Sequence, residues 1–582
     1  MINKAIRIMP PLQGRCPVHT LGGGVNPSVT CGDSSHTGEP FKTRLNSNKS
    51  FKKGVCLLLA LVIVLGITGC TPPPANDSEP PAAMADPIDD NYRTFYQVFV
   101  GSFSDSNGDG IGDLRGLINR LDYLNDGNIN SGKSLGIQGI WLSPIFTSPS
   151  YHKYDAKNYY EIDWRFGTEE DLKELITLCD QRNVKLILDL VINHTSNQHP
   201  WFTEFKAARA SGDTENPYYD YYTCVSTADK ANGVTYQKIA GVDWWYECNF
   251  SGDMPELNYD NTKVREEMLD IAKYYLDLGV DGFRFDAVKY IYYGDTAKSV
   301  DFWNWYMQEL TAYCPDIYCV GECWSGETEI LEYYEAMNCF NFSMAQAEGV
   351  IAAAAKGNAI SKFTSYVESF QERMQEKNQD AMLMPFLSNH DMDRIAGSFV
   401  TENHMKMAAN LYILCSGSPV IYYGEELGMR GSRGGESTDA NRRLAMLWGD
   451  DDLIKDPVGS TYPAEKQIST TVAGQIADSS SLYNYYCQLI AIRHKYPAIA
   501  RGDYRAVSCG EKNMGGFLIG YDVEMLAIFH NTATEEISID LSTCKDLEGY
   551  SFTTLCDYIG VGEARLEGTV LTLSGQTSVI LK

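Results

Sequence analysis

Residues 185–194 have the sequence KLILDLVINH, and this stretch decides the fold. Six of its first eight residues are apolar, which is typical of a strand buried on both faces of a parallel sheet. Asn193 and His194 follow, where the strand is expected to end and its loop to begin. Similar apolar runs predict further strands at residues 136–143, 280–285 and 317–321.

Amphipathic segments lie between these runs. Residues 168–183 are predicted to form a helix, because Thr168 is a suitable N-cap and apolar side chains recur on one face. Residues 262–278 show the same period. Alternating strands and helices indicate a parallel sheet covered by helices. Over roughly 400 residues this α/β pattern favours a (β/α)8 TIM barrel, although spacing alone leaves an open sheet as the alternative.

Two regions depart from the alternation. Residues 195–253 are too long for an ordinary loop and are rich in Tyr, Trp, Asn and Asp, which predicts an inserted domain. Residues 501–582 contain several short strand-like runs, which predict a C-terminal all-β sandwich. The barrel is then assigned to residues 92–194 and 254–500.

The composition excludes several classes of protein. Lys and Arg number 48 against 76 Asp and Glu, which gives a formal net charge of −28. Such a charge opposes phosphate backbones, so we expect no nucleic acid among the partners. A hydrophobic content of 44% excludes a mainly disordered chain. The 16 Cys residues are spread widely, and the sequence determines neither their pairing nor the oligomeric state.

The N-terminal region predicts export. In residues 51–70, lysines precede an apolar run of about 13 residues, which suits a signal peptide and is too short to span a bilayer. The run ends in ITGC, which resembles a bacterial lipobox with Cys70 as the lipidated residue; a plain signal peptide with an unrelated Cys is the alternative. Residues 71–91 predict a flexible linker. Residues 1–50 are interpreted as an extension from a start codon assigned too early, with a structureless extension as the alternative. The expected location is extracellular, with a lipid anchor in the cell membrane.

Charged side chains gather where the predicted strands end. A further short strand is expected at residues 382–387. In a closed parallel barrel, the carboxyl ends of the strands carry the catalytic groups. None of these strand ends carries a G-x-S-x-G, Walker or H-E-x-x-H motif, so we predict acid/base chemistry on an uncharged polyol. The side chains at these ends are Asp189, His194, Arg284, Asp286, Glu322, His390 and Asp391.

Five short segments carry a family resemblance. They are DLVINH at 189–194, MPELN at 254–258, GFRFDAVK at 282–289, GECW at 321–324 and LSNHD at 387–391. They resemble signature regions of the α-amylase family, glycoside hydrolase family 13. MPELN is similar to the intermediate group between oligo-1,6-glucosidases and neopullulanases. The resemblance covers about residues 92–582 and implies a (β/α)8 barrel, a domain B inserted after the third strand and a C-terminal β-sandwich.

The resemblance implies roles for three carboxylates. Asp286 would be the nucleophile, Glu322 the general acid/base, and Asp391 the group that holds the hydroxyls of the reacting sugar. Breaking an acetal needs a proton on the leaving oxygen and a negative charge beside an oxocarbenium-like centre. Glu322 must therefore carry a proton while Asp286 is ionised, and different surroundings can separate their pKa values in this way.

The same resemblance implies six substrate-binding residues. Arg284 lies two residues before the nucleophile in a strand, so it points to the same face and favours the ionised carboxylate. His194 and His390 would donate hydrogen bonds to sugar hydroxyls, and Tyr154 would stack under the sugar. Lys153 stands where the family usually has Gly, which leaves the width of the adjacent cleft open. The six residues are Arg284, His194, His390, Tyr154, Asp189 and Lys289.

The segment DSNGDGIGD at residues 105–113 predicts a metal site. Oxygen ligands at alternate positions with Gly between them can wrap a hard cation such as Ca²⁺. Gly116 stands where an EF-hand has its bidentate Glu, so the loop is not an EF-hand. It resembles the calcium loop of oligo-1,6-glucosidases, with a metal-free acidic turn as the alternative. The implied ligands of this structural Ca²⁺ are Asp105, Asn107, Asp109, the carbonyl of Ile111, and Asp113.

Ala287 indicates which reaction within the family to expect. Ala287 directly after the nucleophile resembles members that act on α-1,4 bonds. We therefore expect retaining hydrolysis of internal α-1,4-glucosidic bonds in an α-glucan polysaccharide or oligosaccharide. The alternatives are a neopullulanase-like or maltodextrin-acting hydrolase and a 4-α-glucanotransferase. A non-catalytic glycan-binding relative is more remote, because such a protein is expected to lose the three carboxylates.

Overall fold

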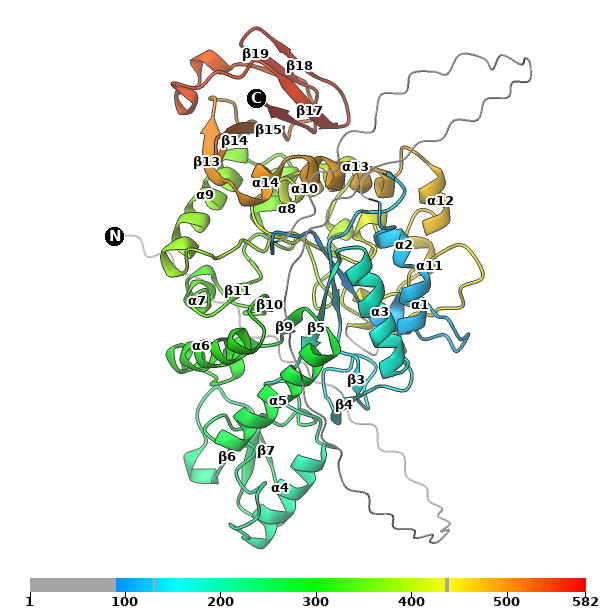
Figure 1. Ribbon diagram of the computed structural model, residues 1–582, viewed down its shortest axis with the longest axis vertical. Coiled ribbons are helices and arrows are strands. Elements are labelled where there is room, and N and C mark those ends of the chain that lie inside the picture. Colours follow the sequence, from blue (N-terminus) through cyan, green and yellow to red (C-terminus); the bar gives the residue numbers. More distant parts are fainter. Residues whose placement is uncertain (1–89, 129–130, 435–438) are drawn as a thin grey trace, which may run out of the picture. The chain divides into compact units, whose positions relative to one another are not determined.

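The computed structural model describes residues 90–128, 131–434 and 439–582 (Figure 1). Its main sheet is parallel, and its strands pair in the order β11-β10-β9-β5-β2-β1-β12. These strands are β1 (Phe95–Val98), β2 (Gly139–Leu142), β5 (Lys185–Leu190), β9 (Gly282–Phe285), β10 (Tyr318–Gly321), β11 (Asn338–Cys339) and β12 (Val420–Tyr422). Nearly every residue in them is buried, as the apolar runs predict.

Two isolated bridges close this sheet into a barrel. Phe340, next to β11, pairs in parallel with Met384, and Phe386 pairs in parallel with Val420 of β12. Residues 384–386 therefore occupy the eighth strand position. The expected strand at 382–387 is reduced to single bridges there, since Pro385 has no N–H for the ladder and contributes only its carbonyl, which accepts from Val420 N at 3.0 Å. The predicted (β/α)8 barrel is confirmed.

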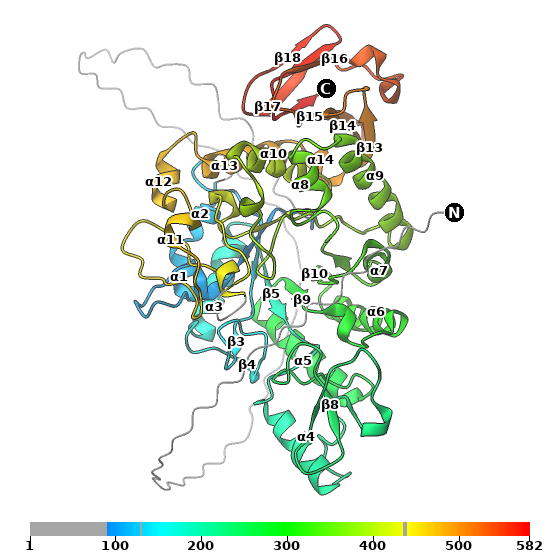
Figure 2. The same cartoon turned by 180° about the vertical axis from the view of Figure 1, so that it is seen from behind.

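Helices cover the outside of the barrel. In both views, α5, α6 and α7 lie outside β5, β9 and β10 (Figures 1 and 2). Helix α3 (Glu169–Gln181) begins with a capping box between Thr168 and Asp171, as the sequence indicates. The other helices are α1 (Leu114–Asn119), α2 (Leu121–Leu124), α5 (Thr262–Leu278), α6 (Thr296–Tyr313), α7 (Glu327–Tyr333), α8 (Val350–Ala355), α9 (Ile360–Lys377), α10 (Glu402–Ile413), α11 (Ala464–Gln467), α12 (Val472–Ala477), α13 (Leu482–Lys495) and α14 (Pro497–Arg501).

The region between β5 and α5 has its own small sheet. It contains α4 (Pro200–Ser211) and the antiparallel strands β6 (Cys224–Val225), β8 (Trp245–Glu247) and β7 (Tyr236–Lys238). Antiparallel bridges join His194 to Glu256 and Tyr222 to Leu257, so both ends of the region are tied together beside the barrel. A hairpin of β3 (Phe146–Thr147) and β4 (Asn158–Ile162), which the sequence did not predict, lies between β2 and α3.

The C-terminal strands form two antiparallel sheets. One has the order β13-β14-β15-β20-β17 and the other β16-β19-β18. Asn410 of α10 donates to the Ile559 carbonyl and to Ser578 Oγ, and Gln371 of α9 donates to the Gly502 carbonyl, so barrel helices bind this domain directly. The strands are β13 (Asp503–Ser508), β14 (Met514–Tyr521), β15 (Glu524–Asn531), β16 (Ile537–Asp540), β17 (Leu555–Gly560), β18 (Ala564–Glu567), β19 (Val570–Leu573) and β20 (Thr577–Leu581).

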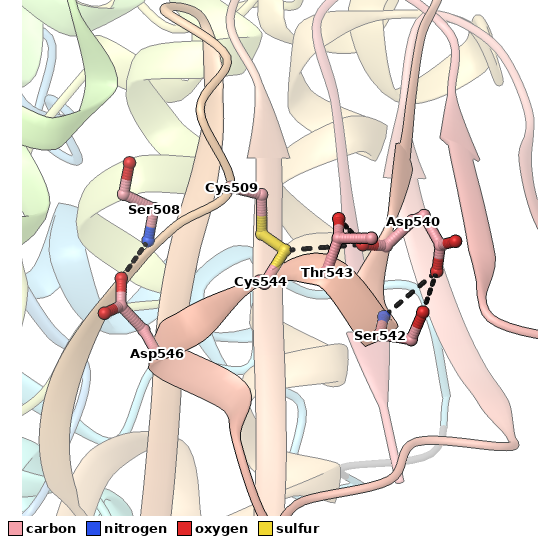
Figure 3. The surroundings of a disulfide bond; sticks show 7 residues. All are labelled: Ser508, Cys509, Asp540, Ser542, Thr543, Cys544 and Asp546. Atoms are coloured by element: carbon pink, nitrogen blue, oxygen red, sulfur yellow. Dashed lines mark hydrogen bonds between the residues drawn. A yellow bond between two sulfur atoms is a disulfide. The ribbon is translucent and has the colours of Figure 1, made fainter.

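A disulfide joins Cys509 and Cys544 within the C-terminal domain (Figure 3). The two residues are 35 positions apart, and their Cα atoms lie 4.8 Å apart. Beside the disulfide, Ser508 N donates to Asp546 Oδ2 at 2.9 Å. The disulfide therefore ties the end of β13 to the turn that follows β16.

The predicted signal peptide, lipobox Cys70 and nearly all of the linker lie outside the described residues. Within residues 90–128, 131–434 and 439–582, none of the helices combines the length and apolar character needed to cross a bilayer.

Candidate active site

Arg284 stands at the centre of the carboxylate cluster. It lies in β9 and is completely buried. Its Nη1 donates to Asp286 Oδ1 at 2.5 Å and to both oxygens of Asp189 at 2.9 and 3.0 Å. Its Nη2 lies 3.4 Å from Glu322 Oε2. One guanidinium therefore contacts carboxylates from three neighbouring strand ends, those of β5, β9 and β10.

The pairing of β9 with β10 brings Asp286 and Glu322 together. Phe285 pairs with Gly321, so the next residue on each strand is one of the two carboxylates. Ala287, in the left-handed region with φ 52°, donates its backbone N–H to Glu322 Oε2 at 3.1 Å. That conformation is unusual for a residue with a side chain, and such backbone strain clusters at active sites. Here it aims an amide at the predicted acid.

The surroundings of Glu322 favour its protonated form. Burial raises the pKa of Glu322 to about 8, with Arg284 opposing the rise and the charges of Asp286 and Asp391 adding to it. A carboxyl group with this pKa carries its proton at neutral pH. By contrast, the 2.5 Å hydrogen bond from Arg284 stabilises the charge on Asp286. The two carboxylates thus have different surroundings, as the predicted acid and nucleophile require.

Asp391 lies in the loop after residues 384–386, and 31% of its side chain is exposed. Its Oδ1 accepts from Arg443 Nη2 at 2.7 Å, and its Oδ2 lies 2.9 Å from His390 Nε2. Burial raises the pKa of Asp391, but His390, Arg443 and Arg284 outweigh burial and hold this pKa well below its usual range. The sequence analysis missed Arg443, because it lies outside the five family segments and no local pattern marks it.

Asp189 lies behind the other carboxylates, which corrects its expected contact with substrate. It is completely buried in β5, opposite Arg284 in the strand register. Besides the bonds from Arg284, its Oδ2 accepts from Tyr154 Oη at 2.8 Å and from Trp141 Nε1 at 3.2 Å. With both oxygens occupied by buried donors, Asp189 orients Arg284 and Tyr154 and does not reach a sugar.

Tyr154 and two histidines line the same region. The Tyr154 ring stacks on the His390 ring with centroids 5.2 Å apart and planes 7° apart. His390 Nδ1 lies 2.7 Å from Gln97 Nε2, and His194 Nε2 lies 3.1 Å from the Tyr154 carbonyl. The ring nitrogens of both histidines thus already have protein partners, and their hydrogen bonds to sugar hydroxyls stay a prediction.

Comparison with known proteins decides the family. The family model described as "Alpha amylase, catalytic domain" matches residues 97–502, more than half of the chain. This chain belongs to the α-amylase family. Alpha-amylase 3 of Dictyoglomus thermophilum is 37% identical over 442 residues, which cover 75% of this chain and 84% of that protein.

Two further relatives extend the comparison. A 4-alpha-glucanotransferase of Thermotoga maritima is 30% identical over 458 residues, 76% of this chain and 96% of that protein. The solved structure of Eubacterium rectale Amy13B matches with a TM-score of 0.77 and 34% identity, covering 85% of this chain and 96% of that one. The predicted family is confirmed, and the protein is an enzyme of the glycoside hydrolase class.

Lys153, which stands where the α-amylase family usually has Gly, points away from the carboxylates. Its backbone has φ 67°, the left-handed region in which Gly has no steric cost. Its buried Nζ lies 2.9 Å from Asp163 Oδ2 and donates to the Ser150 carbonyl at 2.9 Å. The side chain is therefore buried beside the β3–β4 hairpin, where its ammonium pairs with Asp163.

Aromatic rings flank the side of the site where Glu322 lies. Lys289 Nζ donates to the carbonyl of Trp324 at 2.7 Å, which places this predicted substrate-binding residue at the rim. Trp324 is 36% exposed and stacks on Phe342 with centroids 5.1 Å apart. Phe250 contacts His194, with ring centroids 5.2 Å apart, and Tyr290, with ring centroids 4.6 Å apart. The sequence analysis did not single out either the Trp324 or the Phe250 ring.

The predicted metal loop is wound around its own carboxylates. Asp105 accepts from the backbone N–H groups of Gly108 and Gly110, both at 2.7 Å, and Asp113 accepts from that of Ser106 at 3.1 Å. The donor set of the loop is all oxygen, which suits Ca²⁺. However, in the part of the chain that the structure describes, no three His, Cys, Asp or Glu side chains converge on a common metal position.

Proposed function

We propose that this enzyme is a retaining, α-amylase-like glycoside hydrolase that cleaves internal α-1,4-glucosidic bonds of starch and maltodextrins. One observation carries the proposal: a single guanidinium, that of Arg284, contacts both Asp286 and Glu322. Retaining enzymes hold their two carboxyl groups only about 5–5.5 Å apart, whereas inverting enzymes keep them farther apart to admit a water. Sharing one guanidinium favours the shorter separation.

In the first half of the reaction, Glu322 donates its proton to the glycosidic oxygen as the bond to the anomeric carbon breaks. Asp286 then bonds to that carbon and forms a covalent glycosyl-enzyme. A pKa of about 8 keeps the proton on Glu322 until it is needed, and the hydrogen bond from Arg284 stabilises negative charge on Asp286. The leaving chain departs with the proton from Glu322.

In the second half, water enters where the leaving chain was. Glu322, now a carboxylate, removes a proton from this water, and the resulting oxygen nucleophile displaces Asp286. Two inversions at one carbon give net retention. Asp391, fixed by Arg443 and His390, presents acceptor oxygens to the hydroxyls of the reacting sugar, and the Tyr154 ring stacks on His390.

The main alternative is a transferase reaction, which differs from hydrolysis in the molecule that accepts the glycosyl group in the second half. A sugar hydroxyl in place of water gives a longer glucan, and one relative of this enzyme is named a 4-alpha-glucanotransferase. The exposed Trp324 and Phe250 rings are suited to hold such an acceptor sugar. We favour hydrolysis because the relative with 37% identity is named an alpha-amylase.

We place the enzyme outside the cell, attached to the membrane through lipid at Cys70. The Cys509–Cys544 disulfide supports an oxidising compartment, because disulfides are rare in cytosolic proteins. We also propose a structural Ca²⁺ at residues 105–113. Oxygens of Asp105, Asn107, Asp109, Asp113 and the Ile111 carbonyl would hold the ion and stiffen the loop.

The test is incubation of the enzyme with soluble starch, with Asp286→Asn as the control. Hydrolysis of internal bonds predicts a rapid loss of iodine staining, a ladder of maltooligosaccharides and, by NMR, products that first appear as α-anomers. β-Anomers would refute the retaining pair. Products longer than a maltotetraose substrate, with little new reducing sugar, would assign the transferase reaction instead.

A further inference from the structure

Two adjacent arginines hold the loop that carries Asp391. They stand at the end of the 3-10 turn η6 (Ala440–Arg442). Arg442 Nη1 donates to the backbone carbonyl of Asp391 at 2.7 Å. Arg443 Nε donates to the carbonyl of His390 at 3.0 Å, and its Nη2 donates to Asp391 Oδ1 at 2.7 Å. Both arginines therefore fix the backbone of the loop, but only Arg443 bonds to the carboxylate.

Arg443 is itself fixed on its other sides. It is 4% exposed, and its Nη1 donates to Tyr151 Oη at 3.1 Å. Its guanidinium lies 5.4 Å from the centre of the Phe99 ring and 5.7 Å from that of Tyr151. A cation enclosed in this way has little water to solvate it, so its charge is balanced by Asp391 at 2.7 Å and by Asp439, whose Oδ2 lies 4.0 Å from Nη2.

Arg443 supplies charge that His390 does not. Burial lowers the pKa of His390, so its ring is neutral at working pH. The Gln97 amide donates to Nδ1, which leaves Nε2–H to face both Tyr154 Oη at 2.6 Å and Asp391 Oδ2 at 2.9 Å. His390 thus offers a neutral hydrogen bond, whereas a guanidinium stays protonated at any working pH.

Other ionisable groups also face Asp391. Arg284 lowers its pKa, but that guanidinium is already bound to Asp189 and Asp286. The charged and titratable groups around Asp391 are His390, Arg443, Arg284, Glu322, Tyr154 and His152. Among them, Arg443 is the cation that bonds directly to the carboxylate.

We infer that Arg443 is a positioning residue of the proposed reaction, which keeps Asp391 charged and aimed at the hydroxyls of the reacting sugar. The inference rests on the proposed function. Arg443 acts through Asp391 and not on the substrate, so its loss changes how well the site stabilises the distorted sugar in the transition state. A misplacement of about 1 Å at such a group costs on the order of a hundredfold in rate.

The test compares Arg443→Met with Arg443→Lys and with Arg442→Met as the matched neighbour. Arg443→Met removes one of the groups that lower the pKa of Asp391, so we expect the acid limb of the kcat/KM profile to move up by at least about one pH unit. kcat on maltooligosaccharides should fall about a hundredfold. Arg443→Lys should leave the acid limb in place and lower kcat, because lysine retains the positive charge but lacks the planar guanidinium.

Arg442→Met disturbs the same loop and should leave the acid limb in place. The inference would be overturned if the acid limb of Arg443→Met did not shift, or if that of Arg442→Met shifted by the same amount. A second measurement needs no substrate: thermal unfolding of Arg443→Met, Asp391→Asn and the double variant. We expect the two losses in Tm not to add; additive losses would overturn the inference. If the wild type hydrolyses no α-glucan but the losses do not add, the proposed function fails and the Arg443–Asp391 coupling stands.

Discussion

Replacing Glu322 with Gln tests the assignment of the general acid. The side chain keeps its size and can still accept the N–H of Ala287, so the site should stay folded. What it loses is the proton. The rise in the Glu322 pKa from 4.5 to about 8 disfavours its charged form by about 5 kcal/mol, and this makes it the proton donor at neutral pH.

The size of the effect depends on the leaving group. General acid catalysis contributes about 10²- to 10⁴-fold, or roughly 3–5 kcal/mol of barrier. Hydrolysis of starch should fall by that factor. α-Maltosyl fluoride should lose much less in its first step, because fluoride leaves without a proton. In wild type, the basic limb of kcat/KM on maltooligosaccharides should lie near the Glu322 pKa of about 8 and should vanish in Glu322→Gln.

Stopped-flow release of fluoride and reducing-sugar assays across pH 5 to about 10 measure both quantities. Equal losses on starch and on α-maltosyl fluoride would refute the role of Glu322 as acid. So would a basic limb that survives the substitution unchanged.

Three further outcomes concern stability. Removal of calcium with EDTA should lower the unfolding temperature. Ca²⁺ at about a hundredfold excess over its Kd should restore about 2.7 kcal/mol of unfolding free energy. An unchanged unfolding temperature would count against the loop at 105–113 as a calcium site. Cys544→Ser opens a loop of 35 residues and should cost about 3–4 kcal/mol in urea unfolding, with dithiothreitol giving the same loss in wild type only. Burial and the nearby Glu247 raise the pKa of Glu256 in the folded protein. In the folded protein Glu256 therefore keeps a proton that the unfolded chain releases above about pH 4.5, so the free energy of unfolding should decrease as pH rises. Glu256→Gln should flatten that decline above about pH 4.5, and Glu247→Gln should flatten it less; parallel curves for all three proteins would show that this pair does not titrate as described.

Strand ends could be located from sequence because buried parallel strands have a simple signature. The apolar run Lys185–Leu190 is one example. In a parallel barrel, the residues that follow neighbouring strands lie close together, and Asp286 and Glu322 follow β9 and β10, which pair in register. The same logic explains where the prediction failed. Asp189 lies inside its strand and not after it, so its side chain pairs with Arg284 across the sheet and cannot enter the cleft.

Other features depend on contacts that no local pattern encodes. Arg443 lies 52 residues beyond Asp391 in an irregular segment, and only the folded chain brings its guanidinium to that carboxylate. Cys509 and Cys544 pair because β13 and the turn after β16 are neighbours, and many pairings of the 16 Cys were open beforehand. Lys153, at φ 67°, pairs with Asp163, a partner ten residues away across a hairpin that the sequence did not predict.

The most direct measurement of the central claim is to trap the glycosyl-enzyme. Glu322→Gln incubated with α-maltosyl fluoride should form the covalent intermediate readily and hydrolyse it slowly, because the base for the second half is missing. Peptide mass spectrometry should then find a maltosyl ester on Asp286. An ester on another carboxylate, or β-maltose released from the fluoride with no covalent adduct at any time, would contradict the account.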